Sequence, residues 1–196
     1  MDNVTLAILA GGGSRRFGAP KQRARWEDRW LLQELVERWR PAVAQIMLAG
    51  PKVQIAEDAA ALRVDVALDS WPDTGPLAGI HAALLASRTD LIFFLPCDMP
   101  RAPVAALSAF SALLGEADDG VMLQLDDIPV PVCALYRKRL SGQIATAISA
   151  GETKITRALD PAKLILCGES GLRDAGMAPS DFRAFNTPAE LREIFG

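Results

Sequence analysis

A glycine-rich, strongly basic loop near the N-terminus contains the residues best suited to chemistry. It reads LAGGGSRRFGAPK over residues 9–21 and follows the apolar run 4–8. Three consecutive glycines precede three cations: Gly11, Gly12, Gly13, Arg15, Arg16 and Lys21. Glycines lack a Cβ, so their backbone N–H groups can approach a phosphate closely. Three cations beside bare amides repel one another unless an anion lies among them, so the loop suits a triphosphate.

The spacing within this loop excludes two common phosphate-binding motifs. A Walker A loop requires GxxxxGK[ST], and a dinucleotide-binding loop requires GxGxxG directly before a helix. Here Pro20 and the basic residues stand where such a helix would begin. The alternative interpretation is a glycine-rich turn with a solvated basic surface.

Asp98 is the most informative residue outside the loop. It lies in the string LPCDMP, between Pro96 and Pro100, directly after the apolar run 91–95. A carboxylate held at a strand end suits Mg²⁺, which takes one or two carboxylates together with phosphate oxygens. The alternative is an aspartate that caps the following helix.

The segment 69–80, DSWPDTGPLAGI, is the third candidate. Gly75 and Gly79 flank a tight entry into a helix, whose free N–H groups could meet a phosphate or the edge of a base. The alternative is a helix start that binds no ligand. We assign no role to His81, because a lone histidine there is more often a partly buried surface residue.

Composition limits the classes of function. The 196 residues carry a net charge of −3, although residues 1–40 hold eight Lys and Arg against five Asp and Glu. This pattern fits a small anionic ligand better than a nucleic acid. Cys97, Cys133 and Cys167 are widely spaced in apolar runs and indicate buried thiols rather than a zinc site. With no apolar run of membrane-spanning length and no signal-peptide pattern, we expect a cytoplasmic protein that binds neither membrane nor nucleic acid.

Apolar periodicity predicts alternating strands and helices. The predicted strands are 3–9, 43–49, 64–68, 90–96, 120–125, 130–136 and 163–167. The predicted helices are 31–39, 57–62, 77–87, 103–114, 138–150 and a last one from 188, with a weaker segment over 153–159. This alternation predicts an α/β fold with one domain over residues 1–196. We expect a Rossmann-like three-layer sandwich, with a mostly parallel central sheet and helices on both faces. The strands 120–125 and 130–136 are close enough in sequence to form an antiparallel pair.

Three of the candidate motifs follow predicted parallel strands. The glycine loop follows 3–9, Asp69 follows 64–68 and Asp98 follows 90–96. Ligands bind such sheets at the carboxyl ends of the strands, so the three motifs should share one edge. Near the C-terminus, Thr187, Pro188 and Glu190 form the pattern of a capping box at the start of a helix.

The motifs in their order resemble those of the nucleotidyltransferases, and of the molybdenum cofactor guanylyltransferases in particular. The resemblance spans the chain: LAGG, Lys21, Asp69–Ser70, GPLAG, PCDMP, ALY at 134–136, and Asn186 through Leu191 for NTPxEL. The chain departs from this pattern in the Arg- and Trp-rich segment 22–30, at Ala49–Gly50, where an asparagine is common, and at Val130, where a glutamine precedes the proline.

The resemblance implies transfer of GMP from GTP to the phosphate of molybdopterin, with Mg²⁺ as cofactor and pyrophosphate as the second product. It implies catalytic roles for Arg15, Lys21 and Asp98, with Asp98 also binding the metal. It implies an acceptor contact at Asn186 and transient contact with molybdoenzymes or their chaperones. The implied nucleotide-binding residues are Leu9, Ala10, Gly11, Gly12, Gly13, Lys21, Asp69, Gly75, Pro76, Leu77, Gly79 and Asp98.

Three alternative functions stay open. A molybdopterin cytidylyltransferase more often has LAAG in this loop, so Gly12 favours guanine. Sugar-phosphate nucleotidyltransferases share the basic loop, but most are longer and lack the NTPxEL ending. A nucleotide-binding protein without catalysis is the third alternative, and the joint presence of Lys21 and Asp98 disfavours it.

Overall fold

A mixed β-sheet forms the centre of the computed structural model, which describes residues 3–11, 17–51, 54–71 and 74–196. Over those residues the sheet has seven strands in the order β5-β4-β1-β6-β8-β7-β9. The strands are β1 (Val4–Leu9), β4 (Gln45–Gly50), β5 (Asp65–Leu68), β6 (Leu91–Pro96), β7 (Gly120–Leu125), β8 (Ile128–Arg137) and β9 (Leu164–Cys167). Neighbours are parallel except that β8 runs antiparallel to β6 and β7, which confirms the expected sheet and its antiparallel pair.

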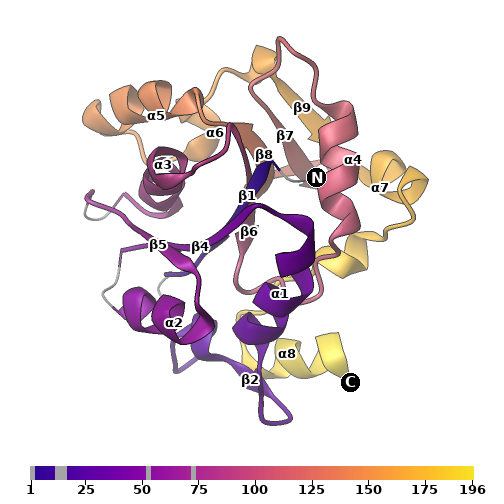
Figure 1. The fold of residues 1–196 in the computed structure, drawn as a ribbon. Helices are drawn as coiled ribbons and strands as arrows, with labels where there is room; N and C mark the ends of the chain where they lie inside the picture. The colour runs from indigo at the N-terminus through magenta and orange to yellow at the C-terminus, as the bar shows by residue number, and fades with distance from the viewer. Residues whose placement is uncertain (1–2, 12–16, 52–53, 72–73) are drawn as a thin grey trace.

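Helices cover both faces of this sheet (Figure 1). One face packs against α1 (Leu31–Trp39), α2 (Gln54–Leu62), α4 (Ala105–Leu113) and α7 (Glu169–Asp174). The other packs against α3 (Pro76–Ala86), α5 (Leu140–Ser149) and α6 (Ile155–Ala158). Successive side chains of a strand point to opposite faces, so Leu6 and Ile8 enter the first core and Ala7 the second. The expected three-layer α/β sandwich is confirmed.

A third, smaller apolar cluster joins the C-terminal helix to a short hairpin. Helix α8 (Pro188–Phe195) packs through Leu191 and Ile194 against Ala24 and Leu31. The 3₁₀ turn η1 (Lys21–Arg23) leads into the hairpin of β2 (Arg25–Trp26) and β3 (Arg29–Trp30). This cluster joins residues 17–31 to the C-terminal segment 185–195.

Several elements were not predicted from the sequence. The hairpin turn uses Glu27 and Asp28 with φ of 47° and 64°, and neither residue gives the usual glycine signal for such a turn. Helix α7 and the 3₁₀ turns η2 (Arg40–Ala42), η3 (Pro161–Lys163) and η4 (Pro179–Phe182) were also missed. The helix predicted over 57–62 begins earlier, at residue 54, and the weak segment 153–159 contains the single turn α6.

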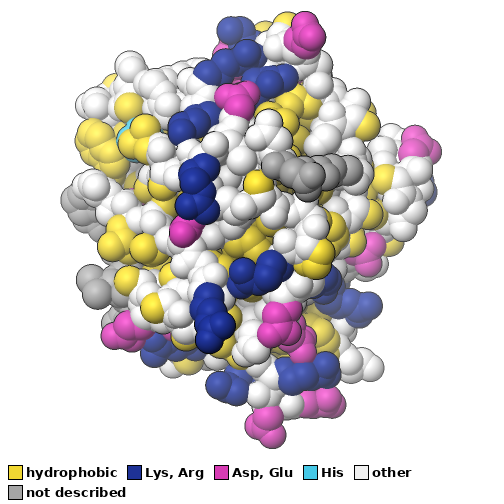
Figure 2. Space-filling view, in the orientation of Figure 1, with side chains coloured by type: hydrophobic (Ala, Val, Ile, Leu, Met, Phe, Trp, Pro, Cys, Tyr) yellow, Lys and Arg dark blue, Asp and Glu magenta, His cyan; other side chains and the backbone are white. Residues whose placement is uncertain are grey.

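The surface in Figure 2 mixes Lys and Arg side chains with Asp and Glu side chains. Exposed ion pairs between the two signs include Arg88–Asp65 and Arg183–Glu193. None of the helices in the described part of the chain is long and apolar enough to cross a membrane.

Candidate functional site

Backbone hydrogen bonds join the loops that follow four parallel strands. Ala10 N donates to Ala49 O at 2.9 Å, which ties the end of β1 to the end of β4. Asp69 N donates to Gly50 O at 3.2 Å, and Cys97 N donates to Leu9 O at 3.1 Å. The carboxyl ends of β5, β4, β1 and β6 therefore lie side by side, as the motif positions predict.

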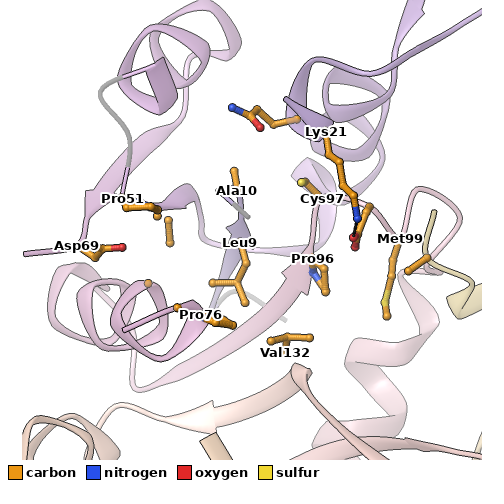
Figure 3. Close-up of a pocket in the computed structure, with 18 residues that line it drawn as sticks. Leu9, Ala10, Lys21, Pro51, Asp69, Pro76, Pro96, Cys97, Met99 and Val132 are labelled. Carbon is orange, nitrogen blue, oxygen red and sulfur yellow. Dashed lines mark hydrogen bonds and ion pairs between the residues drawn. The ribbon is translucent and has the colours of Figure 1, made fainter. Parts of the chain in front are cut away.

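A cavity of about 340 Å³ opens at this edge (Figure 3). Its volume falls at the lower end of the range for small-molecule sites. The residues expected from the sequence that line it are Leu9, Ala10, Gly11, Lys21, Asp69, Gly75, Pro76, Gly79 and Asp98. Leu77 does not line the cavity, because its side chain is fully buried in the core below α3. Gly12, Gly13 and Arg15 lie outside the described residues, and so does Arg16.

Lys21 donates hydrogen bonds to a carboxylate and to a side-chain amide oxygen. It lies on the side of the cavity where Cys97 and Met99 are found (Figure 3). Its Nζ donates to Asp98 Oδ2 at 2.7 Å and to Asn186 Oδ1 at 2.9 Å. The same ammonium lies 5.8 Å from the centroid of the Phe185 ring. Three motifs separated by up to 165 positions thus meet at one cation. An ammonium group placed there can neutralise charge on a phosphate.

The segment that carries Lys21 is held from two sides. Trp30 Nε1 in the hairpin donates to Gln22 O, and Arg23 Nε donates to Asp58 Oδ1 at 2.9 Å on α2. The Asp58 side chain is 6% exposed, whereas the Arg23 side chain is 44% exposed, so the carboxylate of this ion pair is buried and the guanidinium is open to water. The Arg- and Trp-rich segment therefore has a structural role in placing Lys21.

The C-terminal segment is fixed against Asp98. Phe185 N donates to Asp98 O at 3.1 Å. The next residues form the predicted capping box, in which Glu190 N donates to Thr187 Oγ1 and the backbone N–H groups of Asn186 and Thr187 donate to Glu190 Oε2. Hydrogen bonds from the Asn186 and Thr187 backbone lower the pKa of Glu190. The cap thereby sets the position of the Asn186 side chain beside Lys21.

The opposite side of the cavity combines a carboxylate with a helix N-terminus. Gly75 is the N-cap residue of α3 and has φ of 65°, a left-handed conformation that favours glycine. Having no side chain, it leaves the N-terminus of α3 open to the cavity that Gly75 and Pro76 line. Burial raises the pKa of Asp69, and a backbone hydrogen bond from Trp71 opposes this shift. Figure 3 places Asp69 well away from Lys21, across Leu9.

Glycine is required at the end of β4. Gly50 has φ of 157°, and a Cβ at this position would lie 2.0 Å from Ala10 O and 2.8 Å from Ile55 Cδ1. Any side chain here would push the glycine loop away from β4. The departure from the family pattern noted at Ala49–Gly50 was a usable signal for this part of the cavity.

The other lining residues are Gln22, Pro51, Pro96, Cys97, Met99, Val132 and Ala184. They were not predicted as site residues, although Pro96, Cys97 and Met99 belong to the string LPCDMP. Burial raises the pKa of Cys97 to about 12, so its thiol stays neutral at physiological pH and is no nucleophile. His81 lies outside this cavity, in a shallow groove with Trp71, and burial lowers its pKa.

A family model described as the MobA-like NTP transferase domain matches residues 6–163. The chain belongs to this family. The family identity confirms the resemblance to nucleotidyltransferases inferred from the motifs. The matched residues include the glycine loop, Lys21, Asp69 and Asp98.

Named relatives are similar over nearly the whole chain. The molybdenum cofactor guanylyltransferase of Vibrio parahaemolyticus is 30% identical over 193 residues, covering 97% of this chain and 94% of the relative. A probable molybdenum cofactor guanylyltransferase of Bacillus licheniformis is 28% identical over 195 residues, covering 95% and 94%. The crystal structure of molybdopterin-guanine dinucleotide biosynthesis protein A from Archaeoglobus fulgidus has a TM-score of 0.81 at 23% identity, over 97% of this chain and 96% of that one. That structure shares the fold of this chain.

Proposed function

We propose that this chain transfers the guanylyl group of GTP to the phosphate of molybdopterin and releases pyrophosphate. Full-length similarity to relatives named for this activity supports the choice of substrates. The observation that carries the proposal is the meeting of Lys21 with Asp98 and Asn186 beside the cavity. Such a cluster of one cation, one carboxylate and one amide suits a reaction between phosphate groups.

In this proposal the nucleotide extends from Asp69 to Lys21. The N-terminus of α3 and Asp69 would contact the guanosine end, since both offer groups that read polar edges. Lys21 would contact the phosphates, and Gly11 would approach them through its backbone. We retain Gly12, Gly13 and Arg15 as phosphate contacts and Leu77 as a backbone contact, on the family resemblance.

Asp98 is the residue that we propose to hold Mg²⁺. The described residues contain no group of three or more His, Cys, Asp or Glu side chains able to hold a metal. A single carboxylate fits Mg²⁺ all the same, because this ion is commonly bound by one or two carboxylates and by phosphate oxygens. The Asp98 side chain is 21% exposed and lines the cavity, so its oxygens would be available to a metal ion carried by a bound triphosphate. When bound, Mg²⁺ would neutralise charge on the triphosphate.

The protein contributes positioning and charge rather than proton transfer. The acceptor phosphate is already ionised at neutral pH, so it can attack the α-phosphorus without a general base. The new bond joins the acceptor oxygen to the α-phosphorus, and the bond to the leaving pyrophosphate breaks. Lys21 would stabilise the charge that gathers on the phosphates, and holding both substrates in line supplies the rest of the effect.

Asn186 is the proposed acceptor contact, and it acts beside Lys21. Its amide oxygen accepts from Lys21 Nζ, so an acceptor phosphate that reaches Lys21 also approaches Asn186. We further propose a cytoplasmic location and transient contact with molybdoenzymes or their chaperones. Three free, buried cysteines, Cys97, Cys133 and Cys167, support a reducing compartment.

Pyrophosphate release tests the proposal directly. Purified protein is incubated with Mg²⁺ and molybdopterin together with GTP, CTP or ATP in separate reactions. We expect pyrophosphate with GTP only, and only when molybdopterin is present. Preference for CTP would replace the guanylyltransferase by a cytidylyltransferase, and GTP binding without release would favour the non-catalytic alternative.

A further inference from the structure

Gln22 is a buried polar residue of the cavity whose side-chain nitrogen has no partner. The residue is 3% exposed and lines the cavity next to Lys21. Its Nε2 is enclosed and donates no hydrogen bond within the described part of the chain. The two other enclosed atoms of this kind belong to Trp39 and Asp58, and neither residue lines the cavity. A buried donor without an acceptor destabilises a folded protein, so Gln22 calls for an explanation other than stability.

The turn that carries Gln22 is fixed by its neighbours. Gln22 is the middle residue of η1, and its backbone carbonyl accepts from Trp30 Nε1. The side chain of Lys21 is held by hydrogen bonds at the cavity, and that of Arg23 is held by Asp58 on α2. These contacts hold η1 from two sides, so the backbone cannot shift to give the amide a partner. The donor is thereby left for a ligand.

The surroundings of the amide suit a phosphate better than a base. Gln22 directly follows Lys21, so their Cα atoms are about 3.8 Å apart. Gly11 lines the same cavity, whereas Asp69 lies away from Lys21, across Leu9 (Figure 3). A second cation beside Lys21 would repel its ammonium group when no nucleotide is bound. A neutral amide adds a hydrogen-bond donor without that repulsion.

The enclosed nitrogen of Gln22 can be turned without moving the backbone. The last side-chain torsion of glutamine is broad and two-fold, so a half-turn exchanges Nε2 with Oε1 at little cost. Because Gln22 lines the cavity, an anion bound there favours the orientation that turns the N–H groups toward it.

We propose that the side-chain amide of Gln22 donates a hydrogen bond to the phosphate chain of the bound nucleotide. The inference rests on the proposed function, because it needs a triphosphate beside Lys21. It gives the Arg- and Trp-rich segment 22–30, where the chain departs from the family pattern, a direct part in substrate binding in addition to its structural role.

Binding and melting measurements on a variant without the amide test this assignment. Gln22→Met keeps a side chain of similar length and removes the donor. Its Kd for GTP with Mg²⁺, measured by calorimetry, should rise about tenfold, because hydrogen bonds to charged groups are among the stronger ones. Its Kd for guanosine, measured by competition, should stay at the wild-type value, since guanosine has no phosphate. Its melting temperature without nucleotide should not fall, because the variant loses an unpaired donor.

Gln45→Met is the matched control. Gln45 is 5% exposed and lies at the start of β4, away from the cavity. Its amide is paired at both ends, because Oε1 accepts from Thr5 Oγ1 at 2.9 Å and Nε2 donates to Asp65 Oδ2 at 2.7 Å. This variant should therefore melt at a lower temperature and bind GTP with the wild-type Kd.

Each outcome decides between named alternatives. Wild-type GTP affinity in Gln22→Met would overturn the inference, and so would a melting temperature lowered as in Gln45→Met, which would make the amide a structural group. An equal rise in the Kd for guanosine would place Gln22 at the base and overturn it too. Gln22→Leu, which removes the donor with a different shape, should repeat the pattern of Gln22→Met. A wild-type protein that binds no GTP would instead overturn the proposed function, and the inference with it.

Discussion

Lys21 owes its position to residues that are distant in the chain. Asp98 and Asn186 accept its hydrogen bonds, and Phe185 lies below its ammonium group. The Lys21 side chain is 17% exposed, so the charge is only partly screened by water. A partly desolvated cation next to the site of phosphate transfer should matter more for the transition state than for ground-state binding.

Replacement of Lys21 measures this difference. Lys21→Ala should lower kcat by about 10²- to 10³-fold, since it removes a charge that stabilises the transferring phosphate. GTP affinity, measured by calorimetry, should fall far less. Lys154→Ala, which removes an exposed lysine from the segment before α6, is the charge-matched control and should keep wild-type turnover. A Lys21→Ala protein with wild-type kcat would refute the catalytic role.

Among the secondary-structure elements, β4 ends close to the glycine loop, and this close approach depends on Gly50. Gly50→Ala should lower the free energy of unfolding by about 1–3 kcal/mol, because the Cβ meets Ala10 O in a left-handed backbone conformation. Gly142→Ala in α5 is the control, since nothing lies within 4 Å of a Cβ built there. That substitution should stabilise by about 0.5–1 kcal/mol. Urea denaturation of both variants checks the prediction, and equal stabilities would contradict it.

The cap of α8 should make part of the stability depend on pH. The pKa of Glu190 is lowered from its ordinary value of 4.5, so its carboxylate stabilises the folded state above that pH. The stabilisation is lost as pH falls through the lowered folded-state value. The melting temperatures of wild type and Glu190→Gln should therefore differ most near neutral pH and converge in acid.

The control for this pH series lies on the same helix. Glu193 pairs with Arg183 on the surface, and Glu193→Gln keeps both cap N–H groups bonded to Glu190. Its melting temperature should follow the wild-type dependence on pH. A Glu190→Gln difference that stays constant into acid would show that the cap carboxylate has no such role.

The major elements were predictable from the sequence because their residues repeat with clear periods. The run 91–95 is apolar throughout, as expected for the buried strand β6, and Thr187 with Glu190 marks the start of α8. The Trp26–Arg29 turn gave no such signal, because its left-handed residues are Glu27 and Asp28. Tyr136 Oη donates to Pro131 O, five residues away in the same strand, and no local sequence pattern reveals this hydrogen bond.

Part of the candidate site was also predictable, because regular strands place the loops that follow them. Parallel strands place their carboxyl ends together, so the glycine loop, Asp69 and Asp98 could be brought to one edge without coordinates. The contact of Lys21 with Asn186 spans the chain and requires the packing of α8 on the hairpin. Met99 lies in the string LPCDMP and Val132 in the predicted strand 130–136, but only the tertiary packing shows that both line the cavity.

At the scale of the whole molecule, nucleotide binding should stabilise the fold by mass action. A ligand at about one hundred times its Kd adds about 2.7 kcal/mol to the free energy of unfolding. For a chain of this size we expect a rise in melting temperature of roughly 5–10 °C with GTP and Mg²⁺. Differential scanning fluorimetry with CTP as the comparison should give a smaller rise. An equal rise with both nucleotides would contradict guanine selectivity.

Following the α-phosphate of GTP shows whether the guanylyl group is transferred to the acceptor. The protein is supplied with Mg²⁺, molybdopterin and GTP labelled at the α-phosphate, and the products are separated. With the wild-type protein we expect label to move to the pterin. With Asp98→Ala, which removes the proposed metal-holding carboxylate, we expect little transfer. Label that remains in GTP, or leaves it only as free GMP, would contradict the proposed transfer.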